Sequence, residues 1–316
     1  MLSRAPELIE GMIEISYQRK WLETTFSAIK FSQCIVQGLW YSSHPLLQLP
    51  HITEREIKAI TDAAKDSNKT LQEFLATPDG EKKGVSNLSN EQQKDIFNAC
   101  KIIPHLKIQT NLFVEEEEPD LDDEGAAGNN NQANNQNDVR GDTIYEQDLV
   151  TLRVTLTKAN VAEGAESPPV HAPYFPKSLK EAWWLILTDK GTATRKPNTE
   201  AVIHAVEKVT DASRKIVQEL RFMAPPRVGH YEMELHVFSD CYLGLDETIE
   251  VSFDVHAASE LPEYVAHPED LELDNEPTLF EQVMAANIDD SSDDEDEDPK
   301  QVGNGNSVAS DGNESE

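Results

Sequence analysis

Cysteine is scarce in this 316-residue sequence. Only Cys34, Cys100 and Cys241 are present, and no two of them form a Cys-x-x-Cys pair. A disulfide framework or a structural zinc site is therefore not expected. Reduced thiols of this kind fit a cytosolic setting.

Long apolar runs and catalytic motifs are also missing. The longest apolar run, Ala182–Leu187, is far shorter than a membrane span, and no signal peptide opens the chain. No dinucleotide or P-loop glycine pattern, HExxH or GxSxG occurs. His236, Asp240 and Cys241 lie close together, but His236 falls on the polar face of its predicted strand. We interpret the three as surface and turn residues, and we expect no enzyme activity, cofactor or metal.

Positive charge is the third deficiency. The net charge is −32, yet residues 1–114 hold 13 acids and 13 bases, and residues 149–258 hold 15 acids and 12 bases. The excess lies in residues 115–148, with 12 acids and one base, and in residues 259–316, with 19 acids and one base. Lys and Arg form no cluster along the chain, so nucleic acid is not expected as a partner.

The first hundred residues have helical patterns. Apolar spacing predicts two helices over residues 6–41, a helical bundle taken as domain 1–41. Three capping boxes follow, Thr53 with Glu56, Thr70 with Glu73 and Ser89 with Gln92. Short capped helices of this kind indicate a helix-hairpin-helix-like unit over residues 42–103.

From residue 104 the apolar period changes to two. Two long alternating runs, Gly229–Tyr242 and Thr248–Val255, predict an antiparallel strand pair. The run Trp183–Leu187 is apolar throughout, which is typical of a central strand covered on both faces. Seven such strands predict an immunoglobulin-like (fibronectin type III) β-sandwich over 104–258, with a disordered acidic insertion at 115–147. The predicted fold class is α+β multidomain, with a disordered acidic tail at 259–316.

Four short strings occur in an order that resembles one family. They are Pro45–His51 (PLLQLPH), the pair Trp183-Trp184, Pro226-x-x-Gly229-x-Tyr231, and Ser239-Asp240-x-Tyr242-x-Gly244-x-Asp246. Together they resemble the Sec sixty-three domain over roughly residues 6–258. Two kinds of protein carry this domain: the J-domain subunit of the endoplasmic reticulum translocon and a spliceosomal RNA helicase.

The translocon protein is the more similar of the two. Cys34–Leu39, Val170–Pro176 and the acidic tail fit that branch better. The resemblance then implies a non-enzymatic scaffold on the cytosolic face of the endoplasmic reticulum membrane. It would dock on the translocon channel and support post-translational protein import. The alternative is an accessory Sec sixty-three domain of a spliceosomal RNA helicase.

The family's membrane spans and J domain have no counterpart in this sequence. His267-Pro268-Glu269 differs from the J-domain string His-Pro-Asp. We therefore expect a cytosolic fragment of a longer protein or a truncated gene model. Membrane association would come through partners or through missing upstream transmembrane segments.

The tail carries the predicted binding site. Ser291 and Ser292 each have an acid three residues downstream, the pattern that casein kinase II accepts, so both are predicted phosphorylation sites. The resemblance implies a basic partner, the Sec sixty-two subunit of the translocon. The predicted protein-binding residues are Asp289, Asp290, Asp293, Asp294, Glu295, Asp296, Glu297 and Asp298.

Overall fold

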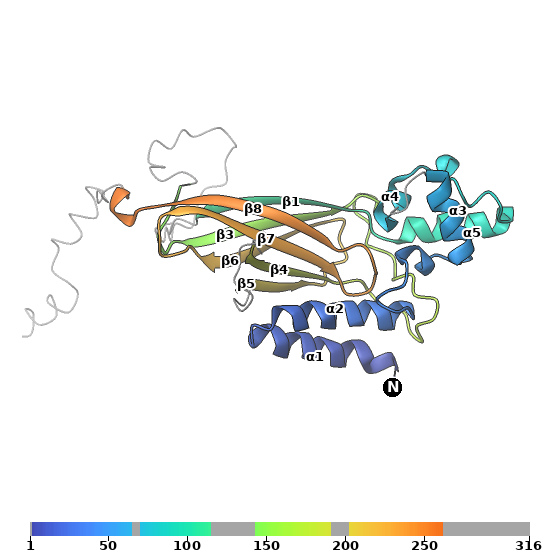
Figure 1. Cartoon of the computed structure of the whole chain (residues 1–316), viewed down its shortest axis with the longest axis horizontal. Helices are drawn as coiled ribbons and strands as arrows, with labels where there is room; N and C mark the ends of the chain where they lie inside the picture. The colour runs from blue at the N-terminus through green and yellow to red at the C-terminus, as the bar shows by residue number, and fades with distance from the viewer. Residues whose placement is uncertain (1, 65–69, 115–142, 191–201, 262–316) are drawn as a thin grey trace, which may run out of the picture. The chain divides into compact units, whose positions relative to one another are not determined.

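The computed structural model describes residues 2–64, 70–114, 143–190 and 202–261 (Figure 1). Helices dominate the first hundred residues and strands the remainder, which confirms the α+β class. The helical elements are η1 (Leu2–Arg4), α1 (Ala5–Gln18), α2 (Leu22–Gln37), η2 (Pro45–Gln48), α3 (Glu54–Ala64), α4 (Leu71–Ala76), η3 (Asp79–Glu81), α5 (Asn90–Ile102) and η4 (Ala258–Glu260). Within the described ranges, no helix is both long and apolar enough to cross a membrane.

Two sheets form the second half of the described chain. The three-stranded sheet has the order β1-β3-β6, and the five-stranded sheet has the order β2-β8-β7-β4-β5. All strand pairs are antiparallel except β2 with β8. The strands are β1 (Leu106–Val114), β2 (Ile144–Tyr145), β3 (Leu149–Lys158), β4 (Trp183–Asp189), β5 (Ile203–Val209), β6 (Lys215–Met223), β7 (Gly229–Ser239) and β8 (Glu247–His256).

The inner faces of both sheets share one hydrophobic core. Val150, Leu152, Val154 and Leu156 of β3 are each 0% exposed, and they belong to the same cluster as Trp183 of β4. This cluster continues into the short helices through residues such as Phe74 and Ile96. The short helices and the two sheets therefore share one continuous apolar core.

The helices α1 and α2 cover the other face of the five-stranded sheet. Ile13 and Ile29 pack in a second cluster with Trp184, Ile186 and Phe238. Strand β4 is thus enclosed on both faces, which confirms the expectation from its uninterrupted apolar run. Helix α2 ends at a glycine, Gly38, in the left-handed conformation at φ 66°.

The predicted helix starts agree with the structure. Thr70 with Glu73 and Ser89 with Gln92 form reciprocal capping boxes at α4 and α5. At α3 the backbone N–H of Thr53 donates to Glu56 at 3.1 Å, while its hydroxyl accepts from Arg55 N. These bonds satisfy backbone donors that each helix leaves unpaired.

One boundary of the predicted insertion is wrong. Strand β2 lies inside residues 115–147, because Ile144 and Tyr145 are buried and pair with Val255 and His256 of β8. The remaining residues 115–142 of this insertion lie outside the described residues.

Candidate functional site: the helix–sheet junction

The loop that connects β7 to β8, residues 240–246, is the point where the helices and the sheets are joined. Its backbone and flanks present the carbonyls of residues 239, 241, 243 and 245 to the helices. Each carbonyl accepts a hydrogen bond from a different glutamine side chain, in chain order: Gln33, Gln37, Gln48 and Gln72. These N···O distances are 2.7, 2.8, 2.7 and 3.4 Å. We call these four residues the junction glutamines.

The chemistry of glutamine suits this position. Gln33, Gln37 and Gln48 are 0, 2 and 4% exposed, so a charged donor here would have to be desolvated. A neutral amide can donate two hydrogen bonds and also accept. Gln48 does both toward one residue, since its Nε2 donates to the Leu243 carbonyl and its Oε1 accepts from Leu243 N at 2.9 Å.

Close backbone packing accompanies these bonds. Gly244 has φ +78°, and a Cβ added there would lie 2.7 Å from Cβ of Pro45. Only glycine therefore fits where the loop meets the first residue of η2. The strings PLLQLPH and Ser239-Asp240-x-Tyr242-x-Gly244-x-Asp246 meet at this contact.

Hydrogen bonds within the loop fix its conformation. The Ser239 hydroxyl accepts from the backbone N–H groups of Cys241 and Tyr242 at 3.2 and 3.0 Å. The Tyr242 hydroxyl accepts from His171 N at 2.8 Å, and Gln37 donates to the His171 carbonyl at 3.2 Å. The connector between β3 and β4, residues 159–182, thus joins the same network.

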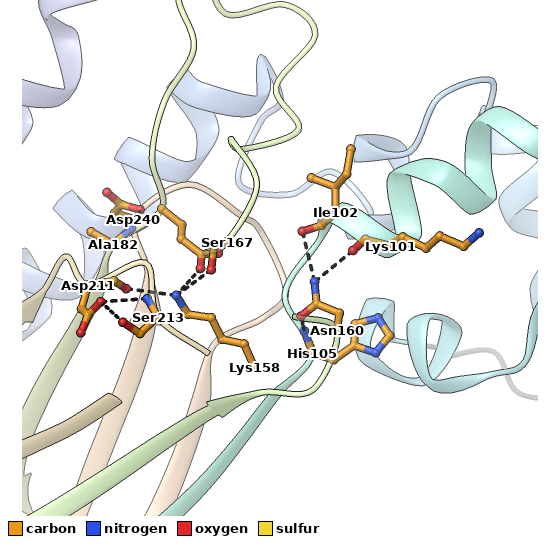
Figure 2. A network of polar contacts seen from close by, with 11 residues as sticks. Lys101, Ile102, His105, Lys158, Asn160, Ser167, Ala182, Asp211, Ser213 and Asp240 are labelled. Carbon is orange, nitrogen blue, oxygen red and sulfur yellow. Dashed lines mark hydrogen bonds and ion pairs between the residues drawn. The ribbon is translucent and has the colours of Figure 1, made fainter. Parts of the chain in front are cut away.

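A buried ion pair lies at the connector's other end. Lys158 Nζ is 2.6 Å from Glu181 Oε1, and the two side chains are 0 and 5% exposed. Figure 2 shows Lys158 also pointing to Ser167 and Asp211, with distances of 2.9 Å to Ser167 Oγ and 3.1 Å to the Asp211 carbonyl. Removing one member of such a pair leaves an uncompensated buried charge. Lys158 thereby holds the connector to the turn before β6.

Sequence reasoning missed Lys158, although a signal was present. It continues the inward positions 150, 152, 154 and 156 of β3, so period-two alternation places it in the core. A lysine in that register requires an acidic or carbonyl partner. Its partner, Glu181, precedes the buried strand β4 by two residues.

Asn160 makes the corresponding connection to α5. Its Nδ2 donates to the carbonyls of Lys101 and Ile102 at 3.0 and 3.4 Å, and its Oδ1 accepts from His105 N at 3.1 Å (Figure 2). These carbonyls lie in the last turn of the helix, where backbone acceptors have no helical partner. The side chain thus joins the end of α5 to the start of β1.

Two aspartates of the junction have raised pKa values. Burial raises the pKa of Asp240 and of Asp246 from 3.8 to about 6. Hydrogen bonds oppose this effect: Asp240 accepts from Ala182 N at 2.9 Å, and Asp246 accepts from Gln33 Nε2 at 2.8 Å. Desolvation is the larger effect at both carboxyls.

The arrangement does not suit nucleophilic catalysis at its cysteine. Burial raises the pKa of Cys241 far above its usual range, so the thiolate is strongly disfavoured. Both ring nitrogens of His236 are hydrogen-bonded to threonines: Nε2 lies 3.1 Å from Thr188 Oγ1, and Nδ1 lies 3.1 Å from Thr248 Oγ1. Among the described residues, no group of three or more His, Cys, Asp or Glu could hold a metal ion.

The predicted exposure of His236 is wrong. It is 8% exposed, and its ring lies 4.7 Å from the ring of Phe26 on α2, measured between centroids. Alternation identified the second face of β7 as polar, but α2 covers that face. Burial accordingly lowers the pKa of His236.

The predicted tail site stays a prediction. All eight acidic residues proposed for protein binding, with Ser291 and Ser292, lie outside the described residues. The site that the structure describes is instead the junction, which brings together residues from distant parts of the sequence between positions 33 and 247. A signal for it was available, because the strings that carry the family resemblance supply Pro45, Gln48 and the β7–β8 loop.

The helices pack against two sheets through the β7–β8 loop, which makes this an α+β domain. Comparison with known families identifies the family. Residues 1–252 match the Sec63 Brl domain. The chain therefore belongs to the Sec63 family, which confirms the family resemblance.

The relatives found among known proteins include helicases. The chain is 26% identical over 258 residues to the U5 small nuclear ribonucleoprotein 200 kDa helicase of Mus musculus. It is 26% identical over 255 residues to the ATP-dependent RNA helicase DExH12 of Arabidopsis thaliana. It is 25% identical over 261 residues to an activating signal cointegrator 1 complex subunit 3-like protein of Dictyostelium discoideum. These matches cover 82, 81 and 80% of the chain but about a tenth of each relative.

These relatives contradict the translocon interpretation. The predictions of a protein-import scaffold, of the translocon channel and the Sec sixty-two subunit as partners, and of the endoplasmic reticulum membrane as location are wrong by this comparison. The features that had favoured the translocon branch, Cys34–Leu39, Val170–Pro176 and the acidic tail, did not separate the two branches of the family. The relatives favour the alternative, an accessory domain of an RNA helicase.

The exclusion of nucleic acid is contradicted by the same relatives. Its physical basis was the lack of Lys and Arg clusters along the chain. A sheet, however, places residues from distant strands side by side, so a basic surface can form without any basic run in the sequence.

We predict that Gln48→Ala weakens the junction. The substitution leaves the buried N–H and carbonyl of Leu243 without their partners, and each loss costs about 1–3 kcal/mol. The free energy of unfolding should fall by about 2–4 kcal/mol in urea denaturation followed by circular dichroism. The control Gln18→Ala, at the exposed end of α1, should change it by less than about 0.5 kcal/mol. Equal effects of the two substitutions would contradict the role of Gln48.

We also predict a pH-dependent effect of Asp246→Asn. Between pH 4 and 6 the folded chain keeps a proton on Asp246 that the unfolded chain has lost, so stability from this group falls as pH rises. Asparagine removes that dependence and keeps the acceptor. The stability of the variant relative to the unchanged chain should therefore rise by about 1–3 kcal/mol from pH 4.5 to 7.5.

The control for this measurement is Asp62→Asn, at an exposed position on α3. Its effect on stability should change less over the same pH range than that of Asp246→Asn, because the Asp62 side chain is exposed. A difference between Asp246→Asn and the unchanged chain that does not vary with pH would refute the raised pKa of Asp246.

Proposed function

We propose that this chain is a non-catalytic accessory Sec63 domain of an RNA helicase. The observation that carries the proposal is the match to helicases across 81–82% of the chain, helices and sheets alike. ATP hydrolysis and strand separation would belong to the remainder of such a helicase. The accessory domain would contribute a rigid structure that carries binding surfaces.

The contacts at the junction support a rigid arrangement of the helices on the sheets. The junction glutamines, Gly244 and the Lys158–Glu181 pair connect the helical elements to both sheets through buried contacts. Buried polar contacts of this kind restrict relative motion more than an apolar contact alone. Forces or contacts received by the helices would therefore be transmitted to the sheets.

The sheets are proposed to form a fibronectin type III-like sandwich. Two sheets of antiparallel strands with a shared core are the architecture of that fold. The Tyr231 hydroxyl near the start of β7 donates to the Arg227 carbonyl at 2.8 Å, the bond of a tyrosine corner. The proposed domain limits are 1–41, 42–103 and 104–258, with the tail from 259.

The surface proposed for contact with the helicase body is the outer face of α1. Leu8, Met12 and Ile15 are 71, 52 and 60% exposed. Their spacing of four and three residues places them on one stripe, separate from the face that carries the buried Ile9 and Ile13. An exposed apolar stripe of this kind marks an interaction site. A second apolar surface, on the rest of the helicase, would cover it.

The test replaces the matched segment of the mouse U5 200 kDa helicase by this chain. ATP-dependent unwinding of a labelled RNA duplex is then compared with that of the helicase lacking the segment. We expect the chimera to unwind RNA and the deletion protein to be impaired. A chimera that also carries Leu8→Lys, Met12→Lys and Ile15→Lys should lose at least half of the unwinding activity that the unsubstituted chimera restores.

The control chimera carries Val202→Lys and Val228→Lys, two exposed valines outside α1. It should unwind RNA as well as the unsubstituted chimera. A folded chimera that unwinds no better than the deletion protein would contradict the proposed function. Equal unwinding by the α1 variant and the control variant would show that the outer face of α1 is not the surface that contacts the helicase body.

A further inference from the structure

The outer face of the three-stranded sheet gathers basic residues from three separate segments. Lys107 of β1 lies opposite Thr157 of β3, which lies opposite Lys215 of β6. Two rows further along, Arg153 pairs with Asn111 and Glu219, and the next outward row contains Phe113, Thr151 and Arg221. We call Lys107, Arg153, Lys215 and Arg221, with the residues between them, the basic sheet face.

The charge of this face differs from that of the chain as a whole. It carries four cations and one acid, Glu219, in a protein of net charge −32. Neighbouring strands lie about 4.8 Å apart and outward residues of one strand about 7 Å apart. The four cations therefore lie on one face of the sheet and are distributed over all three of its strands.

The two lysines are free to bind an anion. Lys107 and Lys215 are exposed, and neither has an acidic partner among the described residues. They flank the Thr157 hydroxyl from the two edge strands of the sheet. Three donors thus lie in one row across the face, with no carboxylate between them.

Arg153 is held in place across the same face. Its guanidinium lies 4.5 Å from the centroid of the Phe113 ring, and its Nε and Nη2 donate to Glu219 at 3.1 and 3.0 Å. Glu219 also lies 3.9 Å from Arg221. One carboxylate therefore orients two arginines and leaves the face with a positive excess.

Apolar groups accompany the charges. Val217 and Met223 of β6 are 51 and 58% exposed, and Leu149, paired with Met223, is 44% exposed. Surfaces that bind single-stranded nucleic acid combine cations along the backbone with apolar or aromatic groups against the bases. Sheet faces serve as such platforms in the common RNA-binding modules.

We propose that the basic sheet face binds single-stranded RNA, with Lys107 and Lys215 contacting phosphates and the apolar side chains contacting bases. This inference rests on the proposed function, because a helicase supplies single strands. Duplex RNA fits less well, since its bases are paired and stacked inside the helix and cannot contact the exposed apolar side chains. An acidic polypeptide is the competing ligand, and the experiment distinguishes it.

The experiment measures fluorescence anisotropy of a labelled twenty-nucleotide oligouridine with the full chain between 50 and 300 mM salt. Each phosphate contact to a single strand contributes about −0.7 to the slope of log affinity against log salt. Lys107→Gln with Lys215→Gln should reduce the slope by about 1.4 in magnitude. If affinity at 1 M salt is unchanged, binding at 0.1 M weakens about 25-fold.

The matched control is Lys58→Gln with Lys94→Gln, two exposed lysines on α3 and α5. This variant should keep the affinity and the slope of the unchanged chain. Equal losses in the two double variants, or no binding of oligouridine by the unchanged chain, would overturn the proposal. Binding of a labelled polyglutamate peptide that depends on Lys107 and Lys215, without such binding of oligouridine, would assign the face to an acidic protein instead.

The inference and the proposed function fail separately. A chimeric helicase that unwinds RNA, beside a chain that does not bind oligouridine, would refute the RNA-binding face and leave the accessory role intact. An inactive chimera, beside oligouridine binding that depends on the two lysines, would refute the accessory role and support the face.

Discussion

Four carbonyls of the β7–β8 loop and its flanks face the interior, where each needs a hydrogen-bond donor. A buried carbonyl without a partner costs about as much as a lost hydrogen bond, and four of them would offset much of a domain's stability. The structure meets this constraint with glutamines from α2, η2 and α4. The loop can therefore be buried only when these helices are in place, and the placement of the helices depends on the loop.

The same constraint explains why polar groups concentrate on this side of the core. Lys158 and Glu181 neutralise each other at the connector, while Asp240 and Asp246 accept backbone and amide donors despite their raised pKa values. Such groups contribute less to stability than apolar replacements could. We infer that they specify how helices and sheets fit together, which is the property that an accessory domain of a larger helicase requires.

Most elements of the fold followed from periodicity, but their assembly did not. The capping pairs, the alternating strands and the continuous run of β4 are local patterns, and the structure contains each of them. The burial of His236 depends on α2, and the pairing of Lys158 with Glu181 depends on a connector, so neither is visible within one strand. The basic sheet face was missed for the same reason, because Lys107, Arg153 and Lys215 meet only across strands. The biological branch was wrongly assigned because two short strings and an acidic tail were taken to distinguish the branches, and features of this kind carry little information about the partner.

Amide hydrogen exchange of the junction tests the central claim most directly. The N–H of Leu243 donates to Gln48, and the N–H of Tyr242 donates to Ser239. If the junction opens only when the whole domain unfolds, both amides should be protected to within about tenfold of Leu185 in β4. Exchange as fast as that of the exposed Gly164, with Leu185 still protected, would show that the helices separate from the sheets and would contradict the account.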